Sequence, residues 1–417
     1  MIVLSQVMTN TKVYRWFFLV AISLPYSIAM FHRVGISTIA SNLLLEFNIS
    51  YVLLGLLGSA YFYSYAFFQP LAGLLSDRGG PIKVILACTL LLTVGALGFA
   101  FSPFISIAII FRIIIGLSAG GTFVPVIYFV SQNFESHQRA KAVSLIMILG
   151  NLGALAAAGP LSLVLKIFNW REATALIALI TFVLALVILI FFLRSRPRSS
   201  QTVVTPTPAG PGAFRFILKN KSLCYSLVAI GVYYGALMSF QGLWGVPFLM
   251  DVYQFSKSSA AMIIMLMPIG LVSGSLVLAQ PLDTRFGRSI WIAGLTLTCI
   301  IFLLLGCSLS APVSLFLYVS IFLLGFCNAV VPYLFRVYSE ILPPAIAGKI
   351  LGLLNVFPFI GVIVFQPLTG MIFDIYEAGA SHTNVSYRIY FLFLAAAMVL
   401  SILAGIRVKL QKTGAVS

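Results

Sequence analysis

Charged residues are scarce in this sequence. Lys, Arg, Asp and Glu make up 8% of the 417 residues, whereas a soluble globular domain carries about 25%. A chain with so little charge cannot cover a water-facing surface with polar groups, so much of it must lie in lipid. Hydrophobic residues reach 61% and form long unbroken runs, whereas membrane-spanning barrels show segments of about ten residues with alternating polarity. The sequence therefore predicts an all-α polytopic membrane protein.

Acidic residues are rarer than basic ones. There are 9 Asp and Glu against 25 Lys and Arg, which gives a net charge of +16. On a soluble domain this excess would indicate nucleic-acid binding. Here the basic residues lie in short loops between apolar runs, which is typical of membrane orientation signals. We expect contact with the lipid bilayer and no nucleic-acid partner.

Several patterns of enzyme and cofactor sites are also missing from the sequence. It has no cluster of metal-ligating residues, no P-loop and no nucleophile elbow, and its acids fall in loops or at helix ends. The five cysteines all lie within apolar runs, so we expect free thiols and no disulfide framework. We therefore expect no enzyme activity, no cofactor and no bound metal.

Twelve apolar runs are each long enough to span a bilayer, for which a helix needs about 20 residues. We place these spans at 16–40, 51–76, 83–101, 105–131, 142–166, 172–193, 222–249, 259–281, 289–309, 312–335, 349–373 and 387–406. A stretch rich in Pro, Ser and Gly over 194–221 separates the first six spans from the last six. The sequence therefore predicts two six-helix bundles, 1–193 and 222–417, joined by a cytoplasmic linker over 194–221.

The loop charges predict the orientation. Nearly all Lys and Arg between the spans fall in alternate loops, and the opposite loops and helix ends hold only Lys166, Arg171, Lys257 and Arg388. Loops rich in Lys and Arg stay on the cytoplasmic side. We expect a multi-pass protein of the cell inner membrane with both termini in the cytoplasm. Because no cleavage site follows the first apolar run, we expect that run to be retained as a helix.

An internal repeat supports this arrangement. An x-Pro-Leu tripeptide lies near the ends of spans 2, 5, 8 and 11, on the middle helix of each three-helix group. The longest match pairs Gln69-Pro-Leu-Ala-Gly-Leu-Leu-Ser-Asp77 with Gln366-Pro-Leu-Thr-Gly-Met-Ile-Phe-Asp374. Chance is the alternative, since Pro and Leu are common in membrane helices, but the shared placement disfavours it. Two three-helix units in each half are typical of secondary transporters.

A charged loop follows the second span. It reads Gly73-Leu-Leu-Ser-Asp77-Arg78-Gly79-Gly80-Pro81-Ile82-Lys83. The glycines permit a close helix approach and a tight reversal, and the Asp–Arg pair offers a charge contact that can break. The loop resembles the loop 2–3 motif of the major facilitator superfamily, G-x-x-x-D-R-x-G-x-x-[RK], which in that family latches the two halves on the cytoplasmic side. The resemblance implies that the conformational latch consists of Gly73, Asp77, Arg78, Gly80 and Lys83. Ile82 stands where a second base is usual, which would weaken the latch, and a plain turn with membrane-anchoring charges is the alternative.

Two further segments extend the resemblance to essentially the whole chain. The fourth span carries Arg112-Ile-Ile-Ile-Gly116-Leu-Ser-Ala-Gly120, which is similar to the R-x-x-x-G-x-x-x-G motif of the same family. The first span carries Phe31-His32-Arg33, and the sequence around it resembles the organic anion:cation symporter branch. In that branch an arginine of the first helix contacts an anionic group of the substrate. The resemblance implies two pseudo-symmetric bundles that work by alternating access.

Only two charged residues lie well inside the spans. A charged side chain at the centre of a membrane helix costs roughly 2.5–3.5 kcal/mol or more, so Arg33 and Arg112 are functional candidates. Since no acid lies inside a span to neutralise them, the transport path should prefer an anion. The planar fork of Arg33 suits a carboxylate or phosphate, and snorkelling to the outer interface is its alternative role. For Arg112 we favour a structural or coupling role. His32 could carry a coupling proton or be a hydrogen-bonded wall residue.

Polar and aromatic residues within the spans complete the candidate substrate-binding set, although packing is the alternative role for any one of them. The set is Arg33, His32, Tyr61, Tyr65, Tyr128, Asn151, Tyr234, Gln241, Trp244, Asn328 and Asn355. We expect a monomeric secondary transporter of a small organic anion, such as a carboxylate or sugar acid, coupled to a proton, Na⁺ or another cation. Export of a drug, siderophore or metabolite is the alternative, and a non-transporting membrane sensor is a weaker one.

Overall fold

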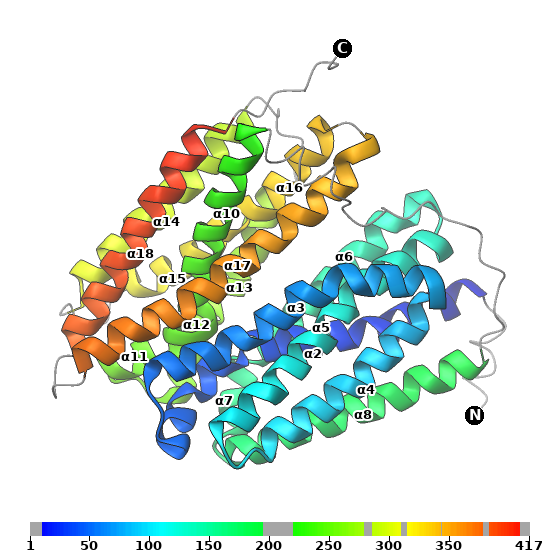
Figure 1. The fold of residues 1–417 in the computed structure, drawn as a ribbon, viewed down its shortest axis with the longest axis horizontal. Coiled ribbons are helices and arrows are strands. Elements are labelled where there is room, and N and C mark those ends of the chain that lie inside the picture. Colours follow the sequence, from blue (N-terminus) through cyan, green and yellow to red (C-terminus); the bar gives the residue numbers. More distant parts are fainter. Residues whose placement is uncertain are drawn as a thin grey trace. The chain divides into compact units, whose positions relative to one another are not determined.

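The computed structural model describes residues 11–194, 220–278, 286–309, 315–342, 344–377 and 383–408, and the regular structure within them is helical (Figure 1). The first half contains α2 (Thr11–Phe47), α3 (Tyr51–Gly79), α4 (Pro81–Ala100), α5 (Ile105–Asn133), α6 (Ser136–Ala156), α7 (Gly159–Val164) and α8 (Trp170–Arg194). The second half contains α10 (Lys221–Ser239), η1 (Phe240–Trp244), α11 (Gly245–Tyr253), α12 (Lys257–Ile264), α13 (Leu266–Leu278), α14 (Gly287–Cys307), α15 (Leu315–Asn328), α16 (Val330–Ile341), α17 (Pro344–Glu377) and α18 (Thr383–Ile406). The predicted all-α class is confirmed. Most of the predicted linker lies outside the described residues.

Twelve helical segments of the described chain are long and apolar enough to cross a membrane, as the sequence predicted. The main difference in length is at the first span, which we expected to end near residue 40 but which continues as α2 to Phe47. It ends where Asn48 takes the left-handed conformation, with φ of 46°. The next helix begins directly, and Ser50 accepts a hydrogen bond from Leu53 N at 3.3 Å.

Three predicted spans are interrupted instead of continuous. The chain leaves the α-helix before Pro160, Pro268 and Pro332, which separates α6 from α7, α12 from α13 and α15 from α16. Proline lacks the N–H that would bond four residues back, and its ring crowds that carbonyl. Pro25 and Pro70, by contrast, lie inside unbroken helices.

The described residues form two compact units that do not coincide with the two halves of the sequence. The first unit contains residues up to Gly35 and those from Tyr63 to the end of α8. The second contains Ile36–Phe62 and the helices from α10 onward. Both α2 and α3 are therefore shared, with one end in each unit. The domain boundaries predicted from the sequence stay a prediction.

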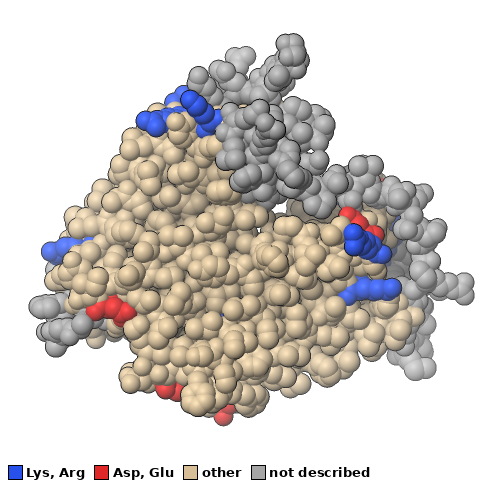
Figure 2. Space-filling view, in the orientation of Figure 1, with Lys and Arg blue, Asp and Glu red and all other residues tan. Residues whose placement is uncertain are grey.

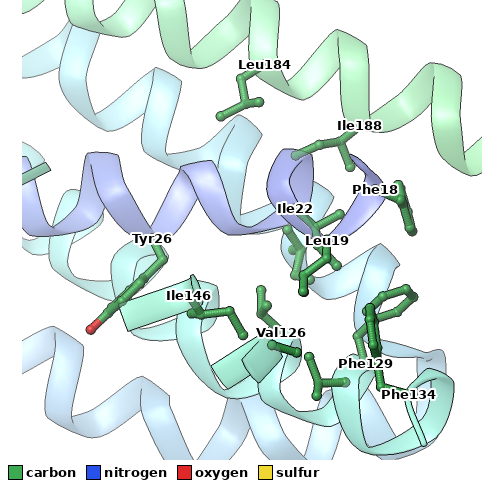
Figure 3. Packing of buried hydrophobic residues seen from close by; sticks show 13 residues of the cluster. Phe18, Leu19, Ile22, Tyr26, Val126, Phe129, Phe134, Ile146, Leu184 and Ile188 are labelled. Atoms are coloured by element: carbon green, nitrogen blue, oxygen red, sulfur yellow. The ribbon is translucent and has the colours of Figure 1, made fainter. Parts of the chain in front are cut away.

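The first unit is built around an apolar cluster (Figure 3). Side chains from α2, α5, α6 and α8 meet there, and α4 packs against both α5 and α8. The cluster contains Phe18, Leu19, Ile22, Tyr26, Val126, Phe129, Phe134, Ile146, Leu184 and Ile188. In the second unit, α10 packs against α17 and α18, α14 against α18, and α13 against α15.

Outside these cores the surface is apolar as well. On α8 the exposed side chains include Leu176, Leu179, Ile180, Phe182 and Val183. Figure 2 shows few charged residues on the visible described surface. Exposing an apolar surface of this kind to water is unfavourable, whereas contact with lipid is favourable. All five cysteines are free, as predicted.

Candidate functional site

The guanidinium of Arg33 lies inside the first unit, stacked on an aromatic ring. Its side chain is 7% exposed, and its central carbon lies 4.7 Å from the centroid of the Tyr65 ring. The Tyr65 hydroxyl accepts a hydrogen bond from Gln69 Nε2 at 3.2 Å, one turn further along α3. A cation over an aromatic face is stabilised by about 0.5–2 kcal/mol. The structure thus brings together Arg33 and Tyr65, which the sequence named separately.

Close helix packing holds this pair in place. A Cβ added at Gly120 on α5 would lie 2.7 Å from the carbonyl oxygen of Tyr65, so α5 touches the α3 backbone at this residue. On the other side, a Cβ at Gly153 on α6 would lie 1.9 Å from the carbonyl oxygen of Ser27 on α2. Small residues allow membrane helices to approach this closely. Both helices that carry the pair are therefore fixed by backbone contact.

Arg112 connects α5 to the turn of α2 that carries the site. Its Nη1 donates a hydrogen bond to the carbonyl oxygen of His32 at 3.0 Å, and its side chain is 1% exposed. Its central carbon also lies 6.0 Å from the Phe99 ring centroid. This contact is made to the backbone beside Arg33. The structural or coupling role that the sequence favours for Arg112 stays a prediction.

The side chain of His32 takes no part in this hydrogen bond, which is made to its backbone carbonyl. Its side chain is buried, its ring lies edge-on to Phe31 with centroids 5.7 Å apart, and its Nε2 makes no hydrogen bond to any described residue. Buried polar atoms without a partner are uncommon in proteins and often mark functional sites. The wall-residue interpretation would need a hydrogen bond that the described residues do not supply.

The electrostatics of the first unit are dominated by two buried guanidiniums. None of the acids whose side chains the structure describes is buried; Asp374 is half-buried and the others are exposed. The acids of the first unit, Asp77, Glu135 and Glu172, lie at helix ends. Burying a guanidinium in a low-dielectric interior costs free energy, so both arginines are candidates for a functional role.

Two other predicted site residues of the first unit make hydrogen bonds with residues outside this pair. The Tyr128 hydroxyl is hydrogen-bonded to Asp77 at the end of α3, so it belongs to the loop motif. The Asn151 amide donates to the carbonyl of Met147 in its own helix at 2.9 Å. Their part in substrate binding stays a prediction.

The remaining predicted residues lie in the second unit, where Trp244 is part of a packed network. Its Nε1 donates to Thr369 Oγ1 at 2.8 Å, and Ser239 Oγ lies 3.0 Å from the same oxygen. Its ring centroid is 4.5 Å from that of Phe373. Gln241 shares the π-helical turn η1 with Trp244 and is also buried. The sequence placed Trp244 in the candidate substrate-binding set, and in the structure its Nε1 already donates to Thr369.

Four other members of the set also lie in the second unit. Tyr61 is buried and contacts Phe62, while Tyr234 is half-buried with its ring centroid 6.1 Å from that of Phe359. Asn328 ends α15, and its buried Oδ1 has no hydrogen bond to the described residues. Asn355 is half-buried on α17.

The loop after α3 forms the tight reversal that the sequence predicted. Gly80 has φ of 86°, which favours glycine, and its N–H donates to the carbonyl of Ser76 at 2.9 Å. The charged residues of the motif, Asp77, Arg78 and Lys83, are exposed. Gly73 departs from expectation, because a Cβ there would meet only Val124, at an ordinary contact distance of 3.7 Å. Close packing therefore does not explain this glycine.

The sequence profile of the Major Facilitator Superfamily matches residues 22–280 and 236–414. The chain belongs to the Major Facilitator Superfamily. Its fold agrees with a solved superfamily transporter: a bacterial homolog of the human lysosomal transporter Spinster superposes with a TM-score of 0.74 over 95% of this chain and 98% of that chain. The two are 19% identical in sequence, so the likeness concerns the fold alone.

The relatives with named substrates include the following two. The gentisate transporter of Corynebacterium glutamicum is 26% identical over 392 residues, which cover 91% of this chain and 84% of the relative. A protein of Cupriavidus necator named a probable sulfoacetate transporter is 27% identical over 178 residues, 43% of this chain and 41% of the relative.

Proposed function

We propose that this superfamily member carries a small organic anion, a carboxylate or sugar acid, across the membrane by alternating access. The observation that carries the proposal is the buried guanidinium of Arg33, stacked on Tyr65 inside a unit whose described acids all lie at helix ends. In this proposal Arg33 binds the anionic group and the Tyr65 ring holds the guanidinium plane. A planar fork that is fixed in this way can pair with both oxygens of a carboxylate.

The relatives support an anionic substrate. Gentisate carries a carboxylate, and sulfoacetate carries a carboxylate and a sulfonate, so both named substrates are small organic anions. The two molecules share a carboxylate, but one has an aromatic body and the other a short aliphatic one. A site that relies on one rigid guanidinium within an apolar surround would suit a family of anions with different bodies.

We also propose that transport is coupled to a proton or another cation, in a protein of the inner membrane with cytoplasmic termini. His32 is the candidate proton carrier, because its Nε2 is buried without a hydrogen bond to the described residues and its backbone carbonyl is held by Arg112. Replacing His32 with Gln should abolish pH-gradient-driven uptake but leave exchange of labelled substrate intact.

A ligand screen tests the substrate class. The purified protein is heated with aromatic carboxylates, sugar acids, sulfonated carboxylates, phosphate esters, amino acids and neutral or cationic amphiphiles. A ligand at 100 times its Kd stabilises the folded state by about 2.7 kcal/mol. The screen is repeated on Arg33→Gln and on a matched control, Arg171→Gln. Arg171 also stacks on an aromatic ring, that of Trp170 at 4.5 Å, and donates to the Ala100 carbonyl at 2.8 Å, but it lies at the start of α8.

We expect anions to stabilise the wild type and the Arg171→Gln control but not Arg33→Gln. Uptake of the best ligand into proteoliposomes then establishes the direction of transport. Stabilisation by neutral or cationic amphiphiles alone, or full anion binding by Arg33→Gln, would reject the proposal in favour of an exporter.

A further inference from the structure

The first turn of α3 is capped by a carboxylate from the far end of α17. Tyr51 N donates to Asp374 Oδ1 at 2.7 Å, and Val52 N donates to Asp374 Oδ2 at 3.0 Å. The first N–H groups of a helix have no partner within the helix and carry the positive end of its dipole. A carboxylate that accepts two of them therefore makes a charge-assisted cap.

The backbones of α3 and α17 also approach each other closely near this cap. A Cβ at Gly370 would lie 2.5 Å from the carbonyl oxygen of Tyr51, and a Cβ at Gly55 would lie 2.4 Å from that of Gln366. The α3 and α17 backbones thus touch at two successive positions, one and two turns of α17 before Asp374. The ring of Tyr51 completes the contact, with its centroid 5.7 Å from that of Phe373.

The C-terminal end of α2 makes two polar contacts with other residues of the second unit. The N–H of Val246 donates to Ser37 Oγ at 3.3 Å. Lys257 Nζ donates to the side-chain oxygen of Asn42. Residues 36–62 thus belong to the first half of the sequence but make these contacts with the second half.

The repeat in the sequence gives Asp374 a counterpart. Asp374 follows Gln366 at the same interval at which Asp77 follows Gln69. Asp77 ends α3, whereas Asp374 caps the beginning of α3, so the two acids serve opposite ends of one helix. The distribution of Lys and Arg among the loops predicts that the two ends of α3 lie on opposite sides of the membrane.

We propose that Asp374 is the lock of a gate on the outer side, formed by residues 36–62 closing on α10–α17, and that it mirrors the inner latch at Asp77. The proposal goes beyond the substrate assignment, because a gate is needed whatever the substrate. Opening toward the outer side must separate α3 from α17, which breaks the two hydrogen bonds of Asp374. Because this carboxylate is only half-buried, water can replace both partners, so the lock can open at modest cost.

Accessibility of a buried cysteine tests the lock. Ser59 lies one turn after Gly55 on α3 and is fully buried. Ser59→Cys is made in a Cys307→Ser background, because Cys307 is the exposed native thiol. Intact cells are treated with a membrane-impermeant thiol reagent, and the labelling rate is compared with and without Asp374→Ala. Asp374→Asn serves as a milder variant, since its amide oxygen can still accept one hydrogen bond.

The matched control is a helix cap whose two partners are close in the sequence. Glu172 accepts from Asn169 N at 2.9 Å, and Asn169 Oδ1 accepts from Glu172 N at 2.9 Å, at the start of α8 on the same predicted side of the membrane. Glu172→Ala removes this cap without touching the proposed gate. The buried Cys88 reports global unfolding, because its labelling should stay slow in every folded variant.

We expect Asp374→Ala to raise the labelling rate of Ser59→Cys about tenfold, the effect of losing a typical helix N-cap. Asp374→Asn should raise it less, and Glu172→Ala should leave it within about twofold, since its cap does not bridge the gate. The lock is rejected if a folded Asp374→Ala or Asp374→Asn protein labels at the parent rate. It is also rejected if Glu172→Ala accelerates labelling as much as the Asp374 variants do.

Discussion

Replacing Gly120 with alanine probes the contact that places the Tyr65 ring beneath Arg33. The new Cβ would lie 2.7 Å from the Tyr65 carbonyl oxygen and 3.3 Å from its Cα. Real Cβ atoms essentially never approach within 3.0 Å of another heavy atom. Because the crowded atoms belong to the backbone, no side chain can rotate away, and α3 and α5 must move apart by a few tenths of an ångström. The matched control is Gly73→Ala, whose Cβ would meet only Val124 at 3.7 Å.

The sizes of the two effects follow from this geometry. Overpacking at a helix contact costs about 1–3 kcal/mol. Alanine in place of a helical glycine contributes about 0.5–1 kcal/mol in favour of folding. Gly120→Ala should therefore lower the free energy of unfolding by about 1–2 kcal/mol, whereas Gly73→Ala should raise it by up to about 1 kcal/mol.

Unfolding of the detergent-solubilised protein by SDS, followed by tryptophan fluorescence, measures both values. A second readout is the affinity for the anion found in the screen, which should fall in Gly120→Ala because the Tyr65 backbone moves and carries its ring with it. The reasoning is refuted if Gly73→Ala is the more destabilised protein, or if Gly120→Ala is as stable as the wild type.

Further predictions concern three side-chain contacts. Tyr65→Phe keeps the ring under the guanidinium and should bind the anion within a few-fold of wild type, whereas Tyr65→Leu should weaken binding by about 2- to 30-fold, as measured by ligand titration. Trp244→Phe removes the donor to Thr369 and should lower the free energy of unfolding by about 1 kcal/mol, as measured by the same SDS titration. Arg112→Gln loses the charged donor to the His32 carbonyl and should weaken anion binding without abolishing it, which distinguishes a positioning residue from a binding one.

The membrane spans could be predicted because a helix in lipid must satisfy its own backbone and must therefore be apolar over its whole length. The end of α2 was misjudged, because the first span was placed at 16–40 and the helix continues to Phe47. In the structure Asn42 is still helical and its polar side chain contacts Lys257. A tertiary contact of this kind cannot be read from local hydropathy.

The proline positions show a second limit of the sequence. Pro25 lies in an unbroken helix and Pro160 follows a break, although both stand in apolar runs. Whether a helix continues through a proline depends on which neighbouring groups satisfy or crowd the freed carbonyl. That information lies in other helices.

The sequence predicted single residues of the candidate site but not which of them contact one another. Arg33 and Tyr65 stood out as a charge and an aromatic residue in apolar spans, but their stacking depends on how closely α5 presses α3. Gln69 was visible in the internal repeat, and its spacing of four residues from Tyr65 is compatible with their hydrogen bond. Asp374 was visible there too, yet nothing local indicated that it would cap a helix more than 300 residues away. The available signal was that both copies of the repeat keep the same polar residues, Gln69 and Gln366 at one position and Asp77 and Asp374 at the other.

The π-helical turn at Phe240–Trp244 has a consequence for comparing this chain with its relatives. A π turn accommodates one more residue than an α turn, so it rotates everything after it by about 100° around the helix. A relative with an unbroken α-helix here would align correctly only with a one-residue gap inside the span. Without that gap, each residue of this helix from Gly245 onward would be aligned with a residue on a different face of the relative's helix.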